Sequence, residues 1–194
     1  MARPTSYDKE AVMSEALEQF WADGFNRSSV DVIVDKTGLN KHSLYQSFGG
    51  KSGLFFRVLQ RYLEQYSLRY LEIFERQQGL AALRGYFQAV LREPDRRGCL
   101  VANTAIELGD SDSDCHRLIT EYYDRLADCF ADAIKQGQRD SSIRADLHPR
   151  DTAIWLVRSV QGLAVDSRLR SLHAPTMKTM LALLTNPTNK SQSH

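Results

Sequence analysis

The sequence predicts an all-α protein, with a compact three-helix domain at its N-terminus and a larger helical domain after it. Apolar residues recur at helical spacing along most of the 194 residues, whereas strand-like alternation is nearly absent. Only five prolines interrupt these patterns. Because the composition shifts near residue 52 from short helices to longer ones, we expect one domain at 1–51 and a second at 52–186. The polar segment 187–194 is expected to be a disordered tail.

The first two helices are bounded by residues that favour helix ends. Gly24 follows an apolar helical face and is expected to stop the first helix. Ser28 or Ser29 can cap a second helix at roughly 29–37, which Gly38 ends because glycine accepts a positive φ. The apolar face of the first helix consists of Val12, Ala16, Leu17, Phe20 and Trp21.

A third short helix is expected at roughly 41–48, and its helical wheel predicts an inner and an outer side. With Leu44 and Phe48 pointing to the core, a turn of about 100° per residue puts His42 and Gln46 farthest from it. The outer side is therefore rich in groups that form hydrogen bonds. The expected helix ends are Asn40 as the N-cap and Gly49-Gly50 as the stop.

Longer amphipathic segments make up the remainder of the chain. Glycine, proline or polar clusters separate them. The expected helices span roughly 52–77, 80–92, 97–108, 113–137, 149–170 and 175–184.

The composition limits the setting in which the protein works. No run of about twenty apolar residues occurs, so neither a membrane-spanning helix nor a membrane partner is expected. The N-terminus lacks the apolar stretch of a secretory signal. Cys99, Cys115 and Cys129 fit free thiols better than a disulfide framework, and their spacing matches no zinc pattern. We therefore expect a cytoplasmic protein with no cofactor and no metal site.

The two short helices at 29–37 and 41–48, joined by a glycine turn, predict a helix-turn-helix. In this motif the second helix enters the major groove of DNA. The net charge of +1 says little, but the cations between 36 and 61 meet no Asp or Glu within that stretch, which favours a polyanion. Such turns also occur in other all-α proteins. The cations are Lys36, Lys41, Lys51, Arg57 and Arg61.

The residue types around the third helix suggest two kinds of DNA contact. Phosphate contacts set the position of a protein on DNA, whereas base-edge contacts set its sequence preference. A helix N-terminus can bind phosphate, and glutamine can pair bidentately with adenine. Alternatively, Tyr45 packs against the protein and Lys51 is a solvated cap. The residues expected at phosphates are Ser29, Lys41, Tyr45 and Lys51, and those expected at base edges are His42, Ser43 and Gln46.

Residues 7–55 resemble the N-terminal region of TetR-family transcriptional regulators, most clearly in SSVDVIVDKTGLNKHSLYQSFGGKSGLF. Proteins of that family have a serine or threonine opening the second helix, a glycine turn, a K-x-S-L-Y-x-x-F recognition helix and a linker lysine. Val34, Thr37 and His42 depart from common family residues, and His42 bears on which bases are read. The matching positions are Ser29, Gly38, Lys41, Ser43, Leu44, Tyr45, Phe48 and Lys51.

The resemblance implies a transcriptional regulator, usually a repressor, rather than an enzyme. It implies a homodimer that presents two recognition helices to a palindromic double-stranded DNA operator. It also implies a C-terminal domain that binds a small-molecule effector. The alternative is an all-α enzyme or a helical interaction module without DNA binding, although no nucleophile elbow, phosphate loop or zinc cluster is present.

The segment 149–170 is the expected dimer helix, because apolar residues surround much of its circumference. Gly162 would let another helix approach closely, and either 113–137 or 175–184 could complete a four-helix interface. The other interpretation is a core helix buried within one subunit. The apolar residues are Ile154, Leu156, Val157, Val160, Leu163, Ala164 and Leu169.

Effector-binding residues are sought among polar and aromatic groups of the second domain. Cys99, Asn103 and Glu107 are spaced i, i+4 and fall on one side of a helix. A buried amide or carboxylate demands a partner, although Glu107 could be exposed, and the aromatic residues could be ordinary core. The candidates are Tyr62, Tyr66, Cys99, Asn103, Glu107, Tyr122 and Trp155.

Cys99 also suggests an electrophile or redox sensor. Arg96 and Arg97 precede it, and nearby cations lower the pKa of a thiol and so make it reactive. The competing interpretation is a small buried apolar residue.

Overall fold

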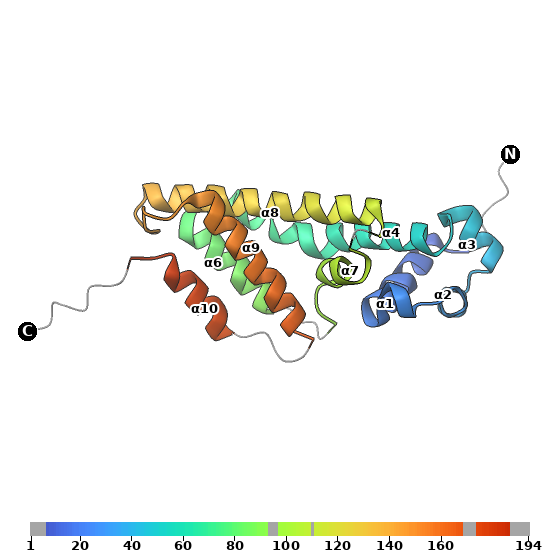
Figure 1. The fold of residues 1–194 in the computed structure, drawn as a ribbon. Helices are drawn as coiled ribbons and strands as arrows, with labels where there is room; N and C mark the ends of the chain where they lie inside the picture. The colour runs from blue at the N-terminus through green and yellow to red at the C-terminus, as the bar shows by residue number, and fades with distance from the viewer. Residues whose placement is uncertain (1–6, 93–96, 110, 169–173, 187–194) are drawn as a thin grey trace, which may run out of the picture. The chain divides into compact units, whose positions relative to one another are not determined.

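A computed structural model describes residues 7–92, 97–109, 111–168 and 174–186 of the chain. Every regular element within these ranges is helical, which confirms the predicted all-α class (Figure 1). The described residues form two compact units. The expected tail at 187–194 lies outside the described residues, as do Arg96 and Leu169.

The first unit combines residues up to 67 with residues 97–120. Its centre is aromatic: the Phe20 and Phe55 rings meet edge to face with centroids 4.9 Å apart, and both side chains are buried. The expected helices at its N-terminus are all present. Its helices are α1 (Lys9–Arg27), α2 (Val30–Thr37), α3 (Lys41–Phe48), α4 (Lys51–Tyr62), α7 (Leu100–Leu108) and the first residues of α8 (Ser113–Arg139).

Caps within the first unit explain where the short helices begin and end. Ser29, rather than the buried Ser28, is the N-cap of α2, and its hydroxyl accepts a hydrogen bond from the Val32 amide at 3.2 Å. The Asn40 side chain caps α3 by accepting from the Ser43 amide at 2.7 Å. Gly38, with φ of 69°, makes the left-handed turn between the two helices.

The single long helix expected at 52–77 is wrong. The α-helical turns of α4 end at Tyr62 and are followed by a π-helical turn (Leu63–Ser67), a 3₁₀ turn (Leu68–Tyr70) and the short α5 (Ile73–Arg76). Apolar residues continue at similar spacing across this stretch, so periodicity does not show the change of hydrogen-bond pattern.

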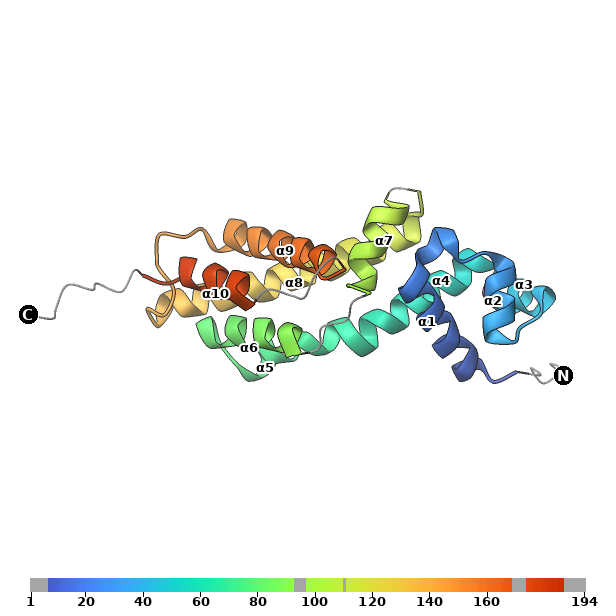
Figure 2. The same cartoon turned by 90° about the horizontal axis from the view of Figure 1, so that it is seen from below.

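The second unit combines residues 68–96 with residues from 121 onward, and Figure 2 shows its helices gathered along α8. Its core is also aromatic, because Phe130 of α8 packs edge to face on Tyr86 with centroids 5.0 Å apart. No helix in the described part of the chain is long and apolar enough to cross a membrane. The remaining helices are α6 (Gly79–Arg92), α9 (Pro149–Asp166) and α10 (Ala174–Leu183).

Candidate nucleic-acid interface

The two sides of α3 differ as the helical wheel predicts. Leu44 and Phe48 are buried, with 0% and 4% of their surface exposed. Tyr45 on the opposite side is 59% exposed, and His42 and Gln46 are exposed as well. The aliphatic and aromatic contacts therefore hold α3 in place, while the imidazole, phenol and amide remain available to a partner. Their contact with DNA is a prediction that this geometry permits.

Tyr45 lies over the start of α4. A β-carbon built on Gly50 would be 2.9 Å from Cε1 of Tyr45, so the ring occupies space that any side chain at residue 50 would need. The glycine pair after α3 thus ends that helix and makes room for Tyr45. The ring rests on backbone and stays largely exposed, and the contact of its hydroxyl with a phosphate stays a prediction.

Two of the five cations expected to meet no carboxylate have acidic partners on neighbouring helices. Lys41 pairs with Asp31 of α2 at 2.6 Å, and Arg61 pairs with Glu10 of α1 at 2.6 Å. The hydrogen bond and the charge of Asp31 hold the pKa of Lys41 above its ordinary value. The stretch 36–61 lacks acids in sequence, but helix packing brings acids to it from outside. Lys41 would have to exchange or share Asp31 on binding phosphate.

Lys51 has a structural role that the sequence did not indicate. Its ammonium donates a hydrogen bond to the carbonyl of Phe25 at 3.0 Å and lies 4.0 Å from the centroid of the Phe25 ring. This contact ties the first residue of α4 to the end of α1. An ammonium has three donors, so a phosphate contact by Lys51 remains compatible with this contact and remains a prediction.

Three of the expected effector residues form one cluster in the first unit. The rings of Tyr62 and Tyr66 stack with centroids 5.2 Å apart, and the Trp21 ring meets each of them edge to face. The thiol of Cys99 forms a hydrogen bond with Tyr62. Trp21 was expected only in the core of the first helix, so its place in this cluster is new.

The idea that Cys99 has a lowered pKa is wrong. Burial of the sulfur raises the pKa of the Cys99 thiol, and hydrogen bonds with Ala102 and Tyr62 offset this only in part. Arg97 is occupied elsewhere, because its guanidinium lies 3.8 Å from the Trp21 ring centroid and pairs with Glu18 at 2.6 Å. Proximity in sequence therefore did not place that cation at the sulfur.

Asn103 and Glu107 lie on α7 as expected, but both have partners within the protein. The Asn103 amide donates to the carbonyl of Arg97 at 2.9 Å. The Glu107 carboxylate accepts a hydrogen bond from the backbone amide of Phe25 at 2.7 Å, across 82 positions of sequence. No local pattern indicated Phe25 as a partner.

Tyr122 and Trp155 belong to the second unit. Tyr122 is buried, with its ring centroid 5.2 Å from that of Tyr123, whereas Trp155 is 42% exposed on α9. Some apolar residues of α9 fit the interpretation as a core helix of one subunit, and others fit the interpretation as a dimer helix. Those buried within the subunit are Ala153, Leu156, Val157 and Leu163, and those largely exposed are Trp155 and Val165.

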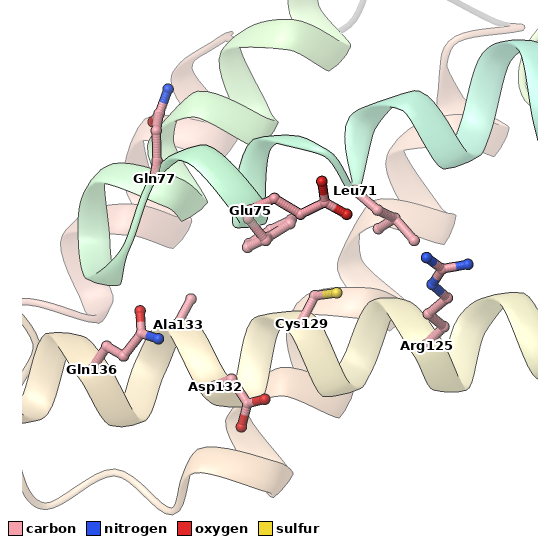
Figure 3. Close-up of a pocket in the computed structure, with 9 residues that line it drawn as sticks. Leu71, Glu75, Gln77, Arg125, Cys129, Asp132, Ala133 and Gln136 are labelled. Atoms are coloured by element: carbon pink, nitrogen blue, oxygen red, sulfur yellow. The ribbon is translucent and has the colours of Figure 1, made fainter.

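Two cavities in the second unit contain none of the expected effector residues. One, of about 240 Å³, lies between the α5 segment and α8, where Leu71 and Glu75 face Cys129 and Arg125 (Figure 3). The other, of about 420 Å³, lies between α6 and α10 and has Arg84 and Lys178 among its lining residues. Neither cavity could be recognised in the sequence, because charged residues such as Arg84 and Lys178 are the type expected on the solvent-exposed side of a helix. No described group of His, Cys, Asp and Glu side chains could hold a metal ion.

Comparison with known protein families assigns both parts of the chain. Residues 12–58 match "Bacterial regulatory proteins, tetR family", and residues 78–183, more than half of the chain, match "Tetracyclin repressor-like, C-terminal domain". The chain belongs to the TetR family. It is a TetR-type DNA-binding transcriptional regulator, as the residues of α2 and α3 indicated.

Individual relatives agree with this assignment. The transcriptional repressor ComR of Escherichia coli K12 is 24% identical over 172 residues, covering 86% of this chain and 82% of ComR. The HTH-type regulator YezE of Bacillus subtilis 168 is 29% identical, covering 79% of this chain and 80% of YezE. A cysteine mutant of the TetR-family regulator CifR, solved with a 26-base-pair operator, has a TM-score of 0.75 at 21% identity, covering 94% of this chain and 96% of CifR. The fold is thus shared, and the relatives are regulators rather than enzymes.

Proposed function

We propose that this TetR-family protein is a repressor that binds a palindromic operator as a homodimer and leaves it when a small molecule binds. The observation that carries the proposal is the orientation of α3, which has Leu44 and Phe48 buried and His42, Tyr45 and Gln46 exposed. Such a helix fits the major groove. The repressor names of two relatives, ComR and the mycobacterial DhaR, support repression.

Dimer formation is supported by apolar surface on the second unit. Trp155 and Val165 of α9 are 42% and 38% exposed, and Leu183 of α10 is 54% exposed. A β-carbon at Gly162 would meet nothing within 4 Å, so this position of α9 is open to another helix. One recognition helix buries too little surface for tight and selective binding, which is a physical reason for pairing.

Release by a small molecule follows the logic of linked equilibria. DNA favours a dimer whose recognition helices are about one helical turn of DNA apart. An effector that favours another spacing lowers the affinity for DNA, and DNA must lower the affinity for the effector by the same factor. The proposed effector residues are those expected from the sequence, except Glu107, which accepts a hydrogen bond from Phe25, and Trp155, which is largely exposed on α9. The raised pKa of Cys99 argues for a non-covalent effector over an electrophile or oxidant.

The test is footprinting on the DNA upstream of the protein's own gene. We expect protection of a palindrome by the wild-type protein, and loss of protection by Tyr45→Ala with unchanged circular dichroism. A panel of small molecules and oxidants is then added to identify what abolishes protection. The absence of any protected palindrome, at protein concentrations where the wild type is folded, would contradict the proposal.

A further inference from the structure

The break in α1 places a non-helical residue, Gly24, shortly before the helix-turn-helix. Gly24 has φ of 80° and ψ of 177°, so the peptide that joins it to Phe25 leaves the helical hydrogen-bond ladder. The chain then makes one more turn and enters α2 through Ser28 and Ser29. The geometry of this peptide sets the direction in which α2 and α3 leave α1.

Side chains from three other places hold this break. The Ser28 hydroxyl donates to the carbonyl of Gly24 at 2.7 Å. The Phe25 amide donates to Oε2 of Glu107, and the Phe25 carbonyl accepts from Nζ of Lys51 at 3.0 Å. A carboxylate and an ammonium thus bind the two ends of one residue, which makes both hydrogen bonds charge-assisted.

Gly24 is also required for the approach of Glu107. A β-carbon at residue 24 would lie 2.3 Å from Oε1 of Glu107, far inside contact distance. Any other residue there would displace the carboxylate, in addition to being strained at that φ. The glycine that ends the regular part of α1 therefore makes the site that receives α7.

A second attachment fixes the other end of the same segment to α1. The Trp21 indole donates to the carbonyl of Gly98 at 2.8 Å, and Arg97 pairs with Glu18 while lying over the Trp21 ring. The segment 97–107 is thus bound to α1 at both ends, through Arg97 and Gly98 at its start and through Glu107 at its end. A change of its position would be transmitted to the backbone from which α2 departs.

We infer that Glu107 is a positioning residue for operator binding: it holds the Phe25 peptide and so orients the helix-turn-helix without touching DNA. This inference rests on the proposed function. It reassigns Glu107, which the sequence suggested as an effector ligand, to the link between the segment 97–107 and the DNA-reading helices.

The direction in which operator affinity changes when Glu107 is replaced distinguishes a positioning role from a simple effect of charge. Removing a negative charge from a DNA-binding protein should strengthen its binding to DNA if charge alone matters. Loss of the Phe25 contact should instead weaken selective binding, because the recognition helix is no longer held in one orientation. We expect Glu107→Ala to lower operator affinity about tenfold, the equivalent of one charge-assisted hydrogen bond. Glu107→Gln, which retains an acceptor oxygen, should lie between this variant and the wild type.

The experiment compares Glu107→Ala, Glu107→Gln and the control Ile106→Ala, whose side chain is 69% exposed on the same helix. Operator affinity is measured for the full chain, together with thermal unfolding and hydrogen exchange of the Phe25 amide. We expect faster exchange at Phe25 in both Glu107 variants and no change in the control. If Glu107→Ala does not fold, the affinity and exchange of Glu107→Gln decide.

Wild-type affinity, or tighter binding, in both Glu107 variants would overturn the inference. So would unchanged protection of the Phe25 amide. Failure of the wild-type protein to bind any operator is a different result, because it would overturn the proposed function itself.

Discussion

On the exposed side of α3, neighbouring residues differ in the chemistry they offer to DNA. Gln46 has a donor and an acceptor that match the edge of adenine, and the two ring nitrogens of His42 can also form hydrogen bonds with a base edge. Lys41 has an ammonium that can donate but not accept, and it already pairs with Asp31 at 2.6 Å. We therefore expect Gln46 and His42 to contribute more to selectivity and Lys41 more to affinity.

Removing Asp31 should strengthen DNA binding. Asp31→Asn frees Lys41 for phosphate, so we expect a few-fold higher affinity at low salt and a steeper salt dependence. Asp35→Asn is the matched control, because Asp35 is an exposed carboxylate on the same helix. Both variants lose one negative charge, and only the first releases Lys41. Equal gains in the two variants, measured by fluorescence anisotropy across a salt series, would show that the ion pair does not restrain Lys41.

The cysteines should be slow to react in the folded protein. Burial and then Asp112 raise the pKa of Cys115 to about 12, and burial raises the pKa of Cys99 and of Cys129. Because each pKa is raised, thiolate forms only at higher pH, and at pH 8 the thiolate fraction of Cys115 is about a thousandfold below that of an unperturbed thiol. Alkylation with iodoacetamide, followed by mass spectrometry, should be far slower than in denaturant and should speed up as the pH rises. Rapid labelling of Cys99 at neutral pH would revive its role as a sensor.

At the scale of elements, the joint between α3 and α4 depends on close backbone contact. A β-carbon at Gly53 would lie 1.8 Å from the carbonyl oxygen of Phe48, the last residue of α3. The two helices can meet this tightly only because residue 53 has no side chain. Since Tyr45 also rests against Gly50, the start of α4 supports both the inner and the outer side of the recognition helix.

Gly53→Ala should therefore destabilise the first unit, even though alanine has the higher helix propensity. Overpacking that moves backbone costs about 1–3 kcal/mol, and we expect this loss in chemical denaturation. Operator affinity should fall with it, because α3 is pushed away from α4. Ser52→Ala, at the exposed neighbouring position, is the control and should leave both quantities unchanged. Wild-type stability for Gly53→Ala would mean that the joint relaxes without cost.

At the scale of the whole molecule, the proposed function requires a second copy of the chain. The apolar residues of α9 that are largely exposed in one chain, Trp155 and Val165, are the proposed dimer surface. Trp155, proposed from the sequence as an effector residue, is 42% exposed there. Its exposure suits a contact between subunits better than the wall of an enclosed pocket.

Trp155→Asp should shift the protein from dimer to monomer, because it places a charge in an apolar interface. Sedimentation velocity at micromolar concentration measures the change, and operator affinity should fall because each monomer presents one recognition helix. Ile106→Asp adds the same charge at a residue that is 69% exposed on α7, and it should remain dimeric. A dimeric Trp155→Asp variant with full affinity would move the interface elsewhere.

Local chemistry explains how much of this structure could be predicted. The caps Ser29 and Asn40, the turn at Gly38 and the inward side of α3 depend on neighbours within four residues, so sequence spacing was sufficient. Interruption of the helix after Tyr62 was missed because the apolar spacing continues through the π turn. The pairing of Lys41 with Asp31 was missed because it requires the packing of one helix on another.

By itself, the sequence determined the helical class, the recognition helix with its two sides, and the family. These follow from periodicity, capping and motif, all of which act over a few residues. Only the tertiary structure decided that burial raises the pKa of Cys99, that Lys51 and Glu107 bind the two ends of Phe25, and which residues of α9 stay exposed. The physical reason is that charge and burial depend on which groups meet in space, and the partners here are up to 82 positions apart in the chain.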